Sequence, residues 1–446
     1  MIVKSISGIR GIVGDGLDPE RVLEFAAHFG QFIKAKSVMV GRDSRLSGES
    51  LKDAVTSGLM GVGVNVIDLG MVPTPTLLYN VKKSNASGGI VITASHNASE
   101  WNALKFVSKN GEFLKKDKME EFLSILNRKI NWKRNEKFGN KEEKRDSIDE
   151  HINGVLKSNY INVPLIKKRK FKVVIDCVNG GASKAYPEFL SRFNMKFYPI
   201  FCEGNGKFLR KPEPRKENLS VLEEKVKDKK ADIGFATDPD GDRLVVVTDK
   251  GEALSEELTI VLATLAVFSK KKGPVVVNLS TTRSMNDITK RAGVSLYRSP
   301  VGEANVVKLM KEKKAIIGGE GNGGIIFPEI QYTRDAMVAM ALILQYITDM
   351  KKPISHIMNT IPQYKIIKKE IKMSSREEQL KFIEKIKKEN KDKKINLKDG
   401  IRIEEGNRWI HIRISGTEPI IRIIAEAPTI EGVMSLYKMV KEQGMN

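Results

Sequence analysis

One order of alternating strands and helices occurs three times along the chain. The copies run from 37 to 93, from 172 to 236 and from 274 to 318, and each reads strand, helix, strand, helix, strand. Short Val/Ile-rich strands between amphipathic helices are typical of mainly parallel sheets covered by helices. The sequence therefore predicts an α/β fold in which three similar mixed α/β domains follow one another.

A chain of 446 residues is also expected to fold as several domains, because single hydrophobic cores stop growing near roughly 250–300 residues. After Gly400 the pattern changes to alternating Ile-rich strands and a closing helix, which predicts a smaller C-terminal α+β domain. The lysine-rich stretch 365–398 before it is expected to form helix and solvated surface. Ligands bind beyond the carboxyl ends of parallel strands, so we expect a central cleft there. The expected domains are 1–153, 154–254, 255–362 and 363–446.

Charge and hydrophobicity limit the partners of this chain. Its formal net charge of +21 is compatible with nucleic acid, anionic membranes or phosphorylated small molecules. Aromatic residues make up only 7% of the chain and the lysines are scattered, unlike a basic stripe interleaved with aromatic side chains. The longest apolar stretch, 336–347, is shorter than a bilayer span of about 20 residues. We expect no nucleic-acid partner and no membrane segment.

The cysteines and the N-terminus indicate a compartment. Cys177 and Cys202 have no Cys or His partner at zinc-ligand spacing, and Cys177 ends an apolar run that predicts a buried free thiol. The first residues lack the uninterrupted apolar core of a signal peptide. These features predict a protein of the reducing cytoplasm.

Three aspartates at alternate positions, Asp238, Asp240 and Asp242, follow the last strand of the second copy. Carboxylates crowded on one tight Pro/Gly turn repel one another unless a cation compensates them. Hard oxygen ligands of this kind suit Mg²⁺. The sequence therefore predicts a magnesium site at this strand end.

The equivalent turn of the first copy offers Ser95 and His96. No Gly-x-Ser-x-Gly elbow surrounds the serine, and by itself it would be interpreted as a capping residue. Its equivalence to the aspartate turn favours a phosphoryl carrier beside Mg²⁺, with Lys105 as a cation or proton-transfer group. Gly/Arg/Ser turns around Arg10 and Arg42 could serve an anionic substrate or hold domains together.

The third copy ends in Gly319-Glu-Gly-Asn-Gly-Gly324. This run has the Gly-x-Gly-x-x-Gly spacing, but an apolar strand follows where a dinucleotide site needs a helix. A flexible turn that presents Glu320 and Asn322 to vicinal sugar hydroxyls is the better interpretation. A purely structural turn is the alternative.

A Gly-flexible turn near the C-terminus combines two guanidinium groups with two hydroxyls, from Arg413, Ser415, Gly416, Thr417 and Arg422. Arginine forks neutralise a phosphate dianion, while hydroxyl and amide donors satisfy its remaining oxygens. The turn is not a P-loop, because no Gly-Lys-Ser/Thr follows. The sequence predicts a phosphate-binding loop.

Together, in this order, the serine loop, the aspartate loop, the Gly-Glu loop and the terminal Arg-x-Ser-Gly-Thr-Glu-Pro resemble the α-D-phosphohexomutase family over nearly the whole chain. The resemblance implies four domains around a central cleft, a phosphoserine, Mg²⁺ and a hexose 1,6-bisphosphate that acts as intermediate and activator. It implies an isomerase that reversibly moves phosphate between positions 1 and 6 of a phosphorylated hexose, as a monomer or homodimer.

The resemblance also implies a role for individual residues. It places them as follows: Ser95 as the phosphorylated carrier with His96 beside it; Asp238, Asp240 and Asp242 on Mg²⁺ with a phosphoserine oxygen; Lys105 in proton transfer; Arg10 and Arg243 near the reacting group; Glu320 and Asn322 on the sugar 3- and 4-hydroxyls; and Arg413, Ser415, Gly416, Thr417 and Arg422 on the phosphate that is not being transferred.

One departure from the family leaves a role open. Many relatives carry Gly-Glu-x-Ser-Gly-His in the third loop and use the histidine in proton transfer, whereas here Asn322 and Gly324 stand at those positions. Another residue would have to supply a second acid/base. The loops look most like a phosphoglucosamine-mutase branch, with phosphomannomutase or phosphoglucomutase specificity as the alternative.

A different enzyme class also remains open at this point. Asp238-x-Asp-Gly is similar to the nucleophile loop of haloacid-dehalogenase-type phosphatases. In such an enzyme Asp238 would carry the phosphate and Ser95 would be dispensable.

Overall fold

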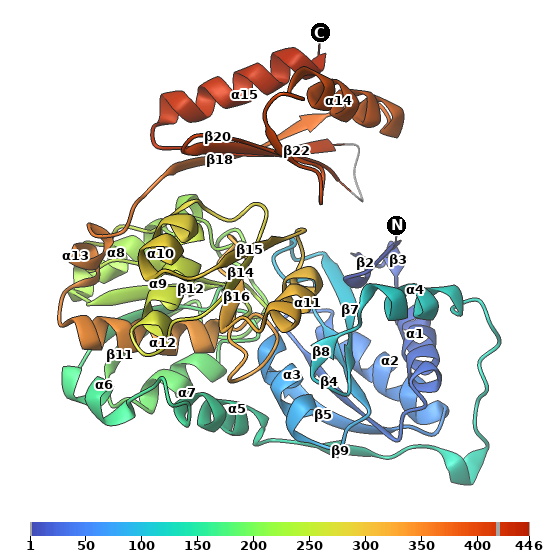
Figure 1. Cartoon of the computed structure of the whole chain (residues 1–446). Helices are drawn as coiled ribbons and strands as arrows, with labels where there is room; N and C mark the ends of the chain where they lie inside the picture. The colour runs from blue at the N-terminus through green and yellow to red at the C-terminus, as the bar shows by residue number, and fades with distance from the viewer. Residues whose placement is uncertain (1, 416–419, 446) are drawn as a thin grey trace. The chain divides into compact units, whose positions relative to one another are not determined.

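The computed structural model describes residues 2–415 and 420–445, and the described residues divide into two compact units (Figure 1). Unit 1 contains the chain up to Lys270 together with Gly323–Ile357. Unit 2 contains Lys271–Asn322 and the chain from Met358 onward. Among the described residues, no helix combines the length and hydrophobicity that a bilayer crossing requires.

The first sheet of unit 1 carries the serine loop. Its strand order is β1 (Ile2–Ser5), β2 (Gly8–Val13), β7 (Trp101–Ser108), β6 (Gly88–Ile92), β4 (Ser37–Arg42), β5 (Asn65–Met71) and β9 (Lys141–Glu143), with β3 (Gly16–Leu17) beside β2 and β8 (Glu112–Phe113) beside β7. Strands β5, β4 and β6 are parallel, and β6 and β7 are antiparallel. The serine loop therefore leaves the sheet at the carboxyl end of a buried central strand.

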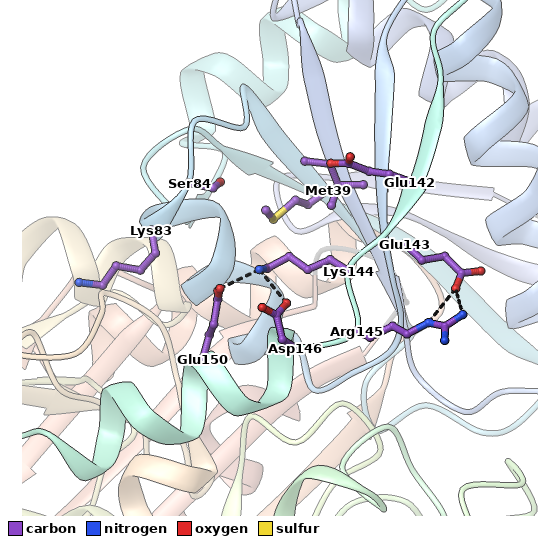
Figure 2. A pocket seen from close by; sticks show the side chains of 10 residues that line it. Met39, Lys83, Ser84, Glu142, Glu143, Lys144, Arg145, Asp146 and Glu150 are labelled. Atoms are coloured by element: carbon purple, nitrogen blue, oxygen red, sulfur yellow. Dashed lines mark hydrogen bonds and ion pairs between the residues drawn. The ribbon is translucent and has the colours of Figure 1, made fainter.

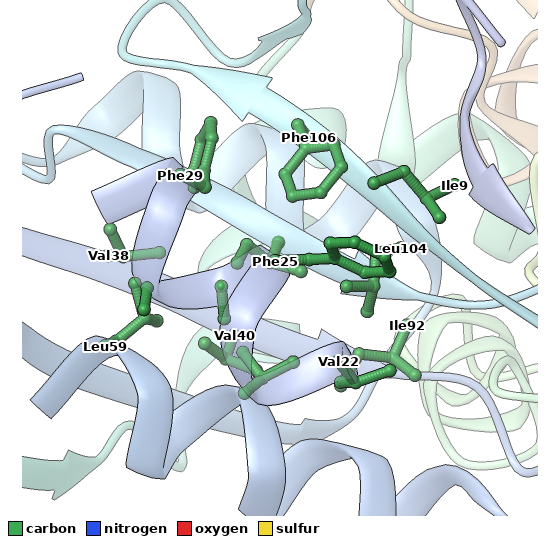
Figure 3. Packing of buried hydrophobic residues seen from close by; sticks show 14 of the residues in the cluster. Ile9, Val22, Phe25, Phe29, Val38, Val40, Leu59, Ile92, Leu104 and Phe106 are labelled. Atoms are coloured by element: carbon green, nitrogen blue, oxygen red, sulfur yellow. The ribbon is translucent and has the colours of Figure 1, made fainter. Parts of the chain in front are cut away.

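Helices cover both faces of this sheet. Helices α1 (Pro19–Phe32), α2 (Gly48–Gly61) and α4 (Lys116–Ser124) lie on one face and α3 (Thr74–Lys83) on the other. Figure 3 shows the core of the first face, where Phe25 and Phe29 of α1 meet Phe106 of β7 and Val40 of β4. Each such buried side chain contributes about 1.5–3 kcal/mol. This packing fixes the strand that ends at the serine loop.

The second sheet of unit 1 carries the aspartate loop. Its order is β11 (Lys196–Ile200), β10 (Lys172–Asp176), β12 (Ile233–Thr237) and β13 (Leu244–Val247), with the first three parallel and β13 antiparallel to β12. The aspartates therefore lie in the turn of a buried hairpin that β12 and β13 form.

The remaining helices and strand of unit 1 are α5 (Ser147–Leu156), α6 (Val163–Arg169), α7 (Ala185–Ser191), α8 (Ser220–Lys229), α9 (Glu257–Phe268), β17 (Ile325–Ile326) and α12 (Ala336–Met350). Helix α13 (Ile354–Met358) ends at the junction with unit 2.

Unit 2 contains a parallel sheet and an antiparallel sheet. The parallel strands are β15 (Leu296–Ser299), β14 (Val275–Asn278) and β16 (Ile317–Gly319), accompanied by α10 (Ser284–Ala292) and α11 (Glu303–Lys313). The antiparallel order is β18 (Lys365–Lys372), β22 (Ile420–Ala427), β21 (Arg408–Ile414), β20 (Ile401–Glu405) and β19 (Lys394–Asn396), packed against α14 (Arg376–Glu389) and α15 (Ile430–Met445). The Gly-Glu loop follows β16, and the terminal loop joins β21 to β22.

The predicted fold class is confirmed, and one local prediction is wrong. In the described chain the same parallel order recurs as β5-β4-β6, β11-β10-β12 and β15-β14-β16. The segment Lys365–Lys372, expected to be helical, is strand β18 and pairs with β22 along its whole length. Its lysines stand on an edge strand, where charged side chains discourage pairing with another chain. The four expected domain boundaries stay predictions.

Candidate active site

The serine loop is held in an unusual backbone conformation. Ser95 is buried and has a φ of 51°, a left-handed value that is uncommon outside glycine and is often found at functional sites. Its N–H donates to Thr93 Oγ1 at 2.9 Å, and the Thr93 hydroxyl donates to Asp43 Oδ2 at 2.7 Å. The Ser95 hydroxyl donates to Asp238 Oδ2 at 3.0 Å, which brings the serine and aspartate loops together.

A single buried arginine, Arg45, holds the serine loop through hydrogen bonds to its backbone carbonyl oxygens. Arg45 donates from Nη2 to the carbonyl oxygens of Ser95 and Asn97, both at 2.7 Å, and from Nη1 to those of Ala98 and Trp101 at 2.5 and 3.0 Å. Its Nε lies 3.0 Å from Asp43 Oδ2, in an ion pair with no exposed side-chain surface. One side chain therefore fixes four carbonyl groups around Ser95.

The aspartate loop is a compact turn stabilised by its own first carboxylate. Asp238 Oδ1 accepts the amide N–H groups of Asp242 and Arg243, each at 3.1 Å, and Gly241 takes a φ of 67° that glycine adopts without strain. Ligand oxygens of Asp238, Asp240 and Asp242 lie within 4.8 Å of one another, and all three side chains are buried. The turn concentrates three carboxylates at one point.

Three cationic side chains contact these carboxylates. Lys105 Nζ lies 2.6 Å from Asp240 Oδ2, and Arg334 Nη2 lies 2.6 Å from Asp242 Oδ2. Arg243 Nε lies 3.8 Å from carboxylate oxygens of both Asp238 and Asp242. The cluster therefore contains charges of both signs at short range.

Burial and mutual repulsion perturb the three carboxyl groups. Burial, followed by the charges of Asp240 and Asp242, raises the pKa of Asp238 well above its ordinary value. Burial also works to raise the pKa of Asp240, but the Lys105 ammonium and hydrogen bonds from Asp238 and Lys105 hold it below its ordinary value. Buried carboxylates that repel each other in this way gain stability when a cation is added.

The donor atoms fit a divalent cation. Asp240 Oδ1 and Asp242 Oδ1 are buried and have no hydrogen-bond partner among the described residues. A buried carboxylate oxygen that accepts no hydrogen bond is costly, so two of them beside a third carboxylate favour a further partner. An all-oxygen set is the ligand type of a hard cation such as Mg²⁺ or Ca²⁺. The residues present are therefore able to hold the predicted metal.

His96 and Arg10 complete the group around Ser95. His96 Nδ1 lies 3.3 Å from Ser95 Oγ, and the positive charge of Arg243, followed by burial and Arg10, lowers its pKa well below the ordinary value. The imidazole is therefore neutral at physiological pH. Arg10 Nη1 donates to Asn97 Oδ1 at 2.8 Å, two residues beyond the serine. The sequence-predicted residues of unit 1 thus come together in one place.

In unit 2 the Gly-Glu loop presents a buried carboxylate. Glu320 Oε1 accepts from Asn278 Nδ2 and from the Gly302 N–H, both at 2.9 Å, while Asn322 Nδ2 lies 3.5 Å from Glu320 Oε2. Glu320 and Asn322 are therefore adjacent, as the sequence predicts, and Asn278 and Gly302 are partners that it missed.

The terminal loop of unit 2 starts from two opposed arginines. Arg413 of β21 and Arg422 of β22 are direct cross-strand partners, an arrangement that repels unless anions are present. Asp399 Oδ2 lies 2.9 Å from Arg413 Nε, and Glu370 Oε1 lies 3.5 Å from Arg422 Nε. Ser415 is buried and its N–H donates to the Ile420 carbonyl. The predicted residues Gly416 and Thr417 lie outside the described residues.

The sequence missed several residues that build these sites. Arg45 lies in the Gly/Arg/Ser turn around Arg42, but nothing in the sequence of the turn distinguishes Arg45 from Arg42. Arg334 belongs to no motif, because the fold alone brings it to Asp242. Thr74, at the start of α3, donates from Oγ1 to Asp240 Oδ2 at 3.0 Å and from its N–H to the Asp240 carbonyl at 2.8 Å.

A separate pocket of about 610 Å³ lies beside strand β9 in unit 1, and none of the sequence-predicted site residues lines it. Figure 2 shows that several of its charged side chains pair with one another: Lys144 contacts Asp146 and Glu150, and Arg145 contacts Glu143.

Family models match the chain in four successive segments. They describe alpha/beta/alpha domains I, II and III of phosphoglucomutase/phosphomannomutase over residues 2–132, 149–251 and 255–364, and the C-terminal domain over residues 370–443. The chain belongs to the phosphoglucomutase/phosphomannomutase family. It is accordingly a phosphohexomutase, an isomerase that transfers a phosphoryl group, and the resemblance inferred from its loops is confirmed.

Relatives and solved structures agree with this assignment. A phosphoglucomutase/phosphomannomutase of Thermococcus kodakarensis is 36% identical over 437 residues, covering 95% of this chain and 94% of that protein. A probable phosphoglucosamine mutase of Pyrococcus horikoshii is 34% identical over 442 residues, covering 97% and 95%. The crystal structure of a family protein from Burkholderia thailandensis superposes with a TM-score of 0.86 at 25% identity, covering 99% of this chain and 96% of that one.

Proposed function

We propose that this phosphohexomutase moves a phosphoryl group between O1 and O6 of one hexose through a phosphate carried on Ser95. The observation that carries the proposal is the hydrogen bond from the Ser95 hydroxyl to Asp238, at 3.0 Å, within a cluster of buried aspartates. A hydroxyl held against carboxylates that suit a divalent cation is well placed to carry a phosphoryl group.

Mg²⁺ is the cation we propose for Asp238, Asp240 and Asp242. Three carboxylate oxygens would leave positions of its octahedral shell for water and for an oxygen of the phosphorylated Ser95. When bound, it would neutralise negative charge on the phosphoryl group during transfer. The buried oxygens of Asp240 and Asp242 that accept no hydrogen bond among the described residues support this assignment.

The charges around the aspartates match a phosphorylated serine. Lys105 and Arg334 each pair with one of the three carboxylates. Arg243 is shared between these carboxylates and Glu213, whose Oε1 lies 3.0 Å from Arg243 Nη1. A bound divalent cation would then leave a surplus of positive charge. A phosphoserine carries about −1.5 to −2 charges at pH 7, so phosphorylation of Ser95 would compensate that surplus. The metal-loaded site should therefore stabilise the phosphorylated form.

The residues around Ser95 would divide the work of the transfer. A sugar hydroxyl oxygen attacks the phosphorus on Ser95, the bond from phosphorus to Ser95 Oγ breaks, and the product is a hexose 1,6-bisphosphate. Lys105 is a cation positioned by Asp240 and would supply the proton that Ser95 Oγ takes up. Neutral His96 would be able to accept a hydrogen bond from the attacking hydroxyl, and Arg10 and Arg243 would stabilise the developing negative charge.

The second half of the reaction repeats the first in reverse. The bisphosphate turns over without leaving, and its other phosphoryl group returns to Ser95. Glu320 and Asn322 would bind the sugar 3- and 4-hydroxyls in both half-reactions, because these hydroxyls occupy the same region of the site after the bisphosphate has turned over. The opposed pair Arg413 and Arg422, with Ser415, Gly416 and Thr417, would bind the phosphate that is not being transferred.

Glucosamine phosphate is the hexose phosphate that we propose as the substrate. The loops resemble a phosphoglucosamine-mutase branch, and the Pyrococcus horikoshii relative carries the name probable phosphoglucosamine mutase. Glucose or mannose phosphate is the second candidate, supported by the name of the Thermococcus kodakarensis relative. The phosphatase alternative has no support from either relative.

A substrate comparison tests the proposal. Purified protein with Mg²⁺ and a trace of hexose 1,6-bisphosphate is assayed on the 6-phosphates of glucosamine, glucose and mannose, with formation of each 1-phosphate as the readout. We expect the highest kcat/KM for glucosamine 6-phosphate and loss of isomerisation in Ser95→Ala. Higher kcat/KM for glucose or mannose would reassign the substrate, and full activity in Ser95→Ala would refute the carrier.

A further inference from the structure

The two cysteines, which are distant in sequence, come together in unit 1. Cys177 directly follows β10 and Cys202 lies two residues beyond β11, and these parallel strands are neighbours whose final pair is Asp176 with Ile200. Cys177 is buried and Cys202 is half-buried. The Cys202 Sγ lies 3.7 Å from the Ile175 carbonyl oxygen on the neighbouring strand.

A left-handed residue turns Cys202 toward Cys177. Side chains alternate along a strand, so regular extension would place residues 177 and 202 on opposite faces of the sheet. Phe201 instead has a φ of 50°, which interrupts the regular extension, and Cys202 Sγ lies 3.3 Å from the Ile200 carbonyl oxygen. Cys202 lies near enough to Cys177 to contribute to the raised pKa of the Cys177 thiol.

Backbone hydrogen bonds hold the two segments in this arrangement. Asn179 donates from its N–H to the Phe201 carbonyl at 2.5 Å, and its Oδ1 accepts the Glu203 N–H at 3.0 Å. Adjacent strands lie about 4.8 Å apart, and disulfides span roughly 4.4–6.8 Å between Cα atoms, so residues that follow neighbouring strand ends are suitably spaced for a crosslink.

We propose that Cys177 and Cys202 form a reversible intramolecular disulfide, so that this sulfur pair is an oxidative modification site of the chain. The co-reactant is a hydroperoxide. The Cys202 thiolate, on the more accessible sulfur, attacks the peroxide oxygen, the O–O bond breaks, and a sulfenic acid forms with release of the alcohol or water. The Cys177 sulfur then attacks the Cys202 sulfur and expels the oxygen as water. The two sulfurs lose two electrons in total and the peroxide gains them.

The order in which the two sulfurs react follows from their surroundings. Cys177 has no exposed surface, and burial, followed by the neighbouring Cys202, raises the pKa of its thiol well above the ordinary value. It is therefore protected from direct attack by peroxide and suited to act second, on a sulfenic acid already beside it.

The disulfide would lie at the base of the aspartate loop. Beyond Cys177 the chain turns through Gly181, whose N–H donates to the Pro239 carbonyl at 2.7 Å. Before it, Asp176 accepts two hydrogen bonds from Arg210, which also donates to the Thr237 carbonyl at 2.7 Å. A crosslink between residues 177 and 202 would therefore restrain segments that support this loop.

Peptide mapping of the intact chain tests the proposal. The protein is treated with hydrogen peroxide, alkylated with iodoacetamide under denaturing conditions, digested without reductant and analysed by mass spectrometry. We expect a crosslinked peptide pair two hydrogen masses lighter than the sum of the two peptides, which disappears after treatment with dithiothreitol. Recovery of both cysteines as alkylated thiols, or of Cys202 as sulfinic acid beside alkylated Cys177, would overturn the proposal.

Two single variants and one stability measurement complete the test. In Cys202→Ser, Cys177 should remain fully alkylatable after peroxide treatment, whereas in Cys177→Ser, Cys202 should oxidise beyond the sulfenic acid. The oxidised wild-type chain should unfold about 5 °C or more above the reduced chain, because a crosslink restricts the unfolded ensemble. A lower thermal unfolding midpoint in the oxidised chain would show that the disulfide strains the native fold, and it would contradict the proposal.

Discussion

Replacement of Arg45 by methionine is predicted to release the serine loop. The guanidinium group donates to the carbonyl oxygens of Ser95, Asn97, Ala98 and Trp101. Methionine preserves much of the apolar stem but removes every one of these donors. It also leaves Asp43 buried without its cation, because that ion pair has no exposed side-chain surface.

The magnitude follows from the burial of this pair. Removal of one partner of a buried ion pair costs about 3–5 kcal/mol, because the remaining charge is uncompensated. Burial already raises the pKa of Asp43, so this carboxyl group would partly escape the cost by taking up a proton. The local stability of the loop should therefore fall by about 3 kcal/mol, which is roughly a hundredfold in an opening equilibrium.

Hydrogen exchange followed by mass spectrometry measures this opening directly. We expect amides of the segment 93–103 to lose about two orders of magnitude of protection in Arg45→Met. Arg42→Met is the matched control, because Arg42 pairs with the exposed Glu49 and its loss should change protection less than tenfold. Wild-type protection of the serine loop in Arg45→Met would refute the role assigned to Arg45.

Three further predictions concern the aspartate loop and unit 2. In Gly180→Ala the new Cβ would meet Pro239 backbone atoms at 2.6 Å, so divalent-cation affinity measured by calorimetry should fall, and unchanged affinity would contradict this packing. Arg334→Met should weaken Mn²⁺ binding about tenfold, because Asp242 loses the hydrogen bond that orients its carboxylate, and Arg334→Lys should recover most of it; equal affinities in all three proteins would contradict that role. Burial lowers the pKa of His411 to about 4, below its unfolded value of about 6.5. The unfolded state therefore takes up the proton first, and unfolding free energy should fall by up to about 3 kcal/mol as pH drops from 6.5 to 4, whereas His411→Gln should lose this dependence.

Much of the candidate active site can be predicted from the sequence because it lies at strand ends. Ser95 and Asp238 each follow a parallel strand of a recurring unit, and the edge where such strands end is where ligands bind. The identity of the residues then indicated the chemistry, since three alternating carboxylates need a cation. The contact between the two loops required the fold, because no local pattern encodes a hydrogen bond between residues 143 positions apart.

Other features depend on tertiary contacts that the sequence does not display. Arg334 contacts Asp242 from 92 positions away in the sequence. Arg45 donates to backbone carbonyl oxygens, and because every residue has one, no sequence motif identifies these acceptors. The lysine-rich stretch 365–398 is expected to form helix and solvated surface, but its first part is strand β18, because pairing with β22 outweighs the helix propensity of its lysines. The proximity of Cys177 and Cys202 depends on the left-handed Phe201, a conformation that phenylalanine itself gives no reason to expect.

The central claim is that Ser95 carries the phosphoryl group. The most direct test is to incubate the protein with Mg²⁺ and a hexose 1,6-bisphosphate, measure the intact mass and map the modified peptide. The account predicts an increase of one phosphate located on Ser95, its loss on addition of the hexose monophosphate substrate, and no increase in Ser95→Ala. Phosphate found on Asp238, or a Ser95→Ala protein that is still phosphorylated and active, would contradict it.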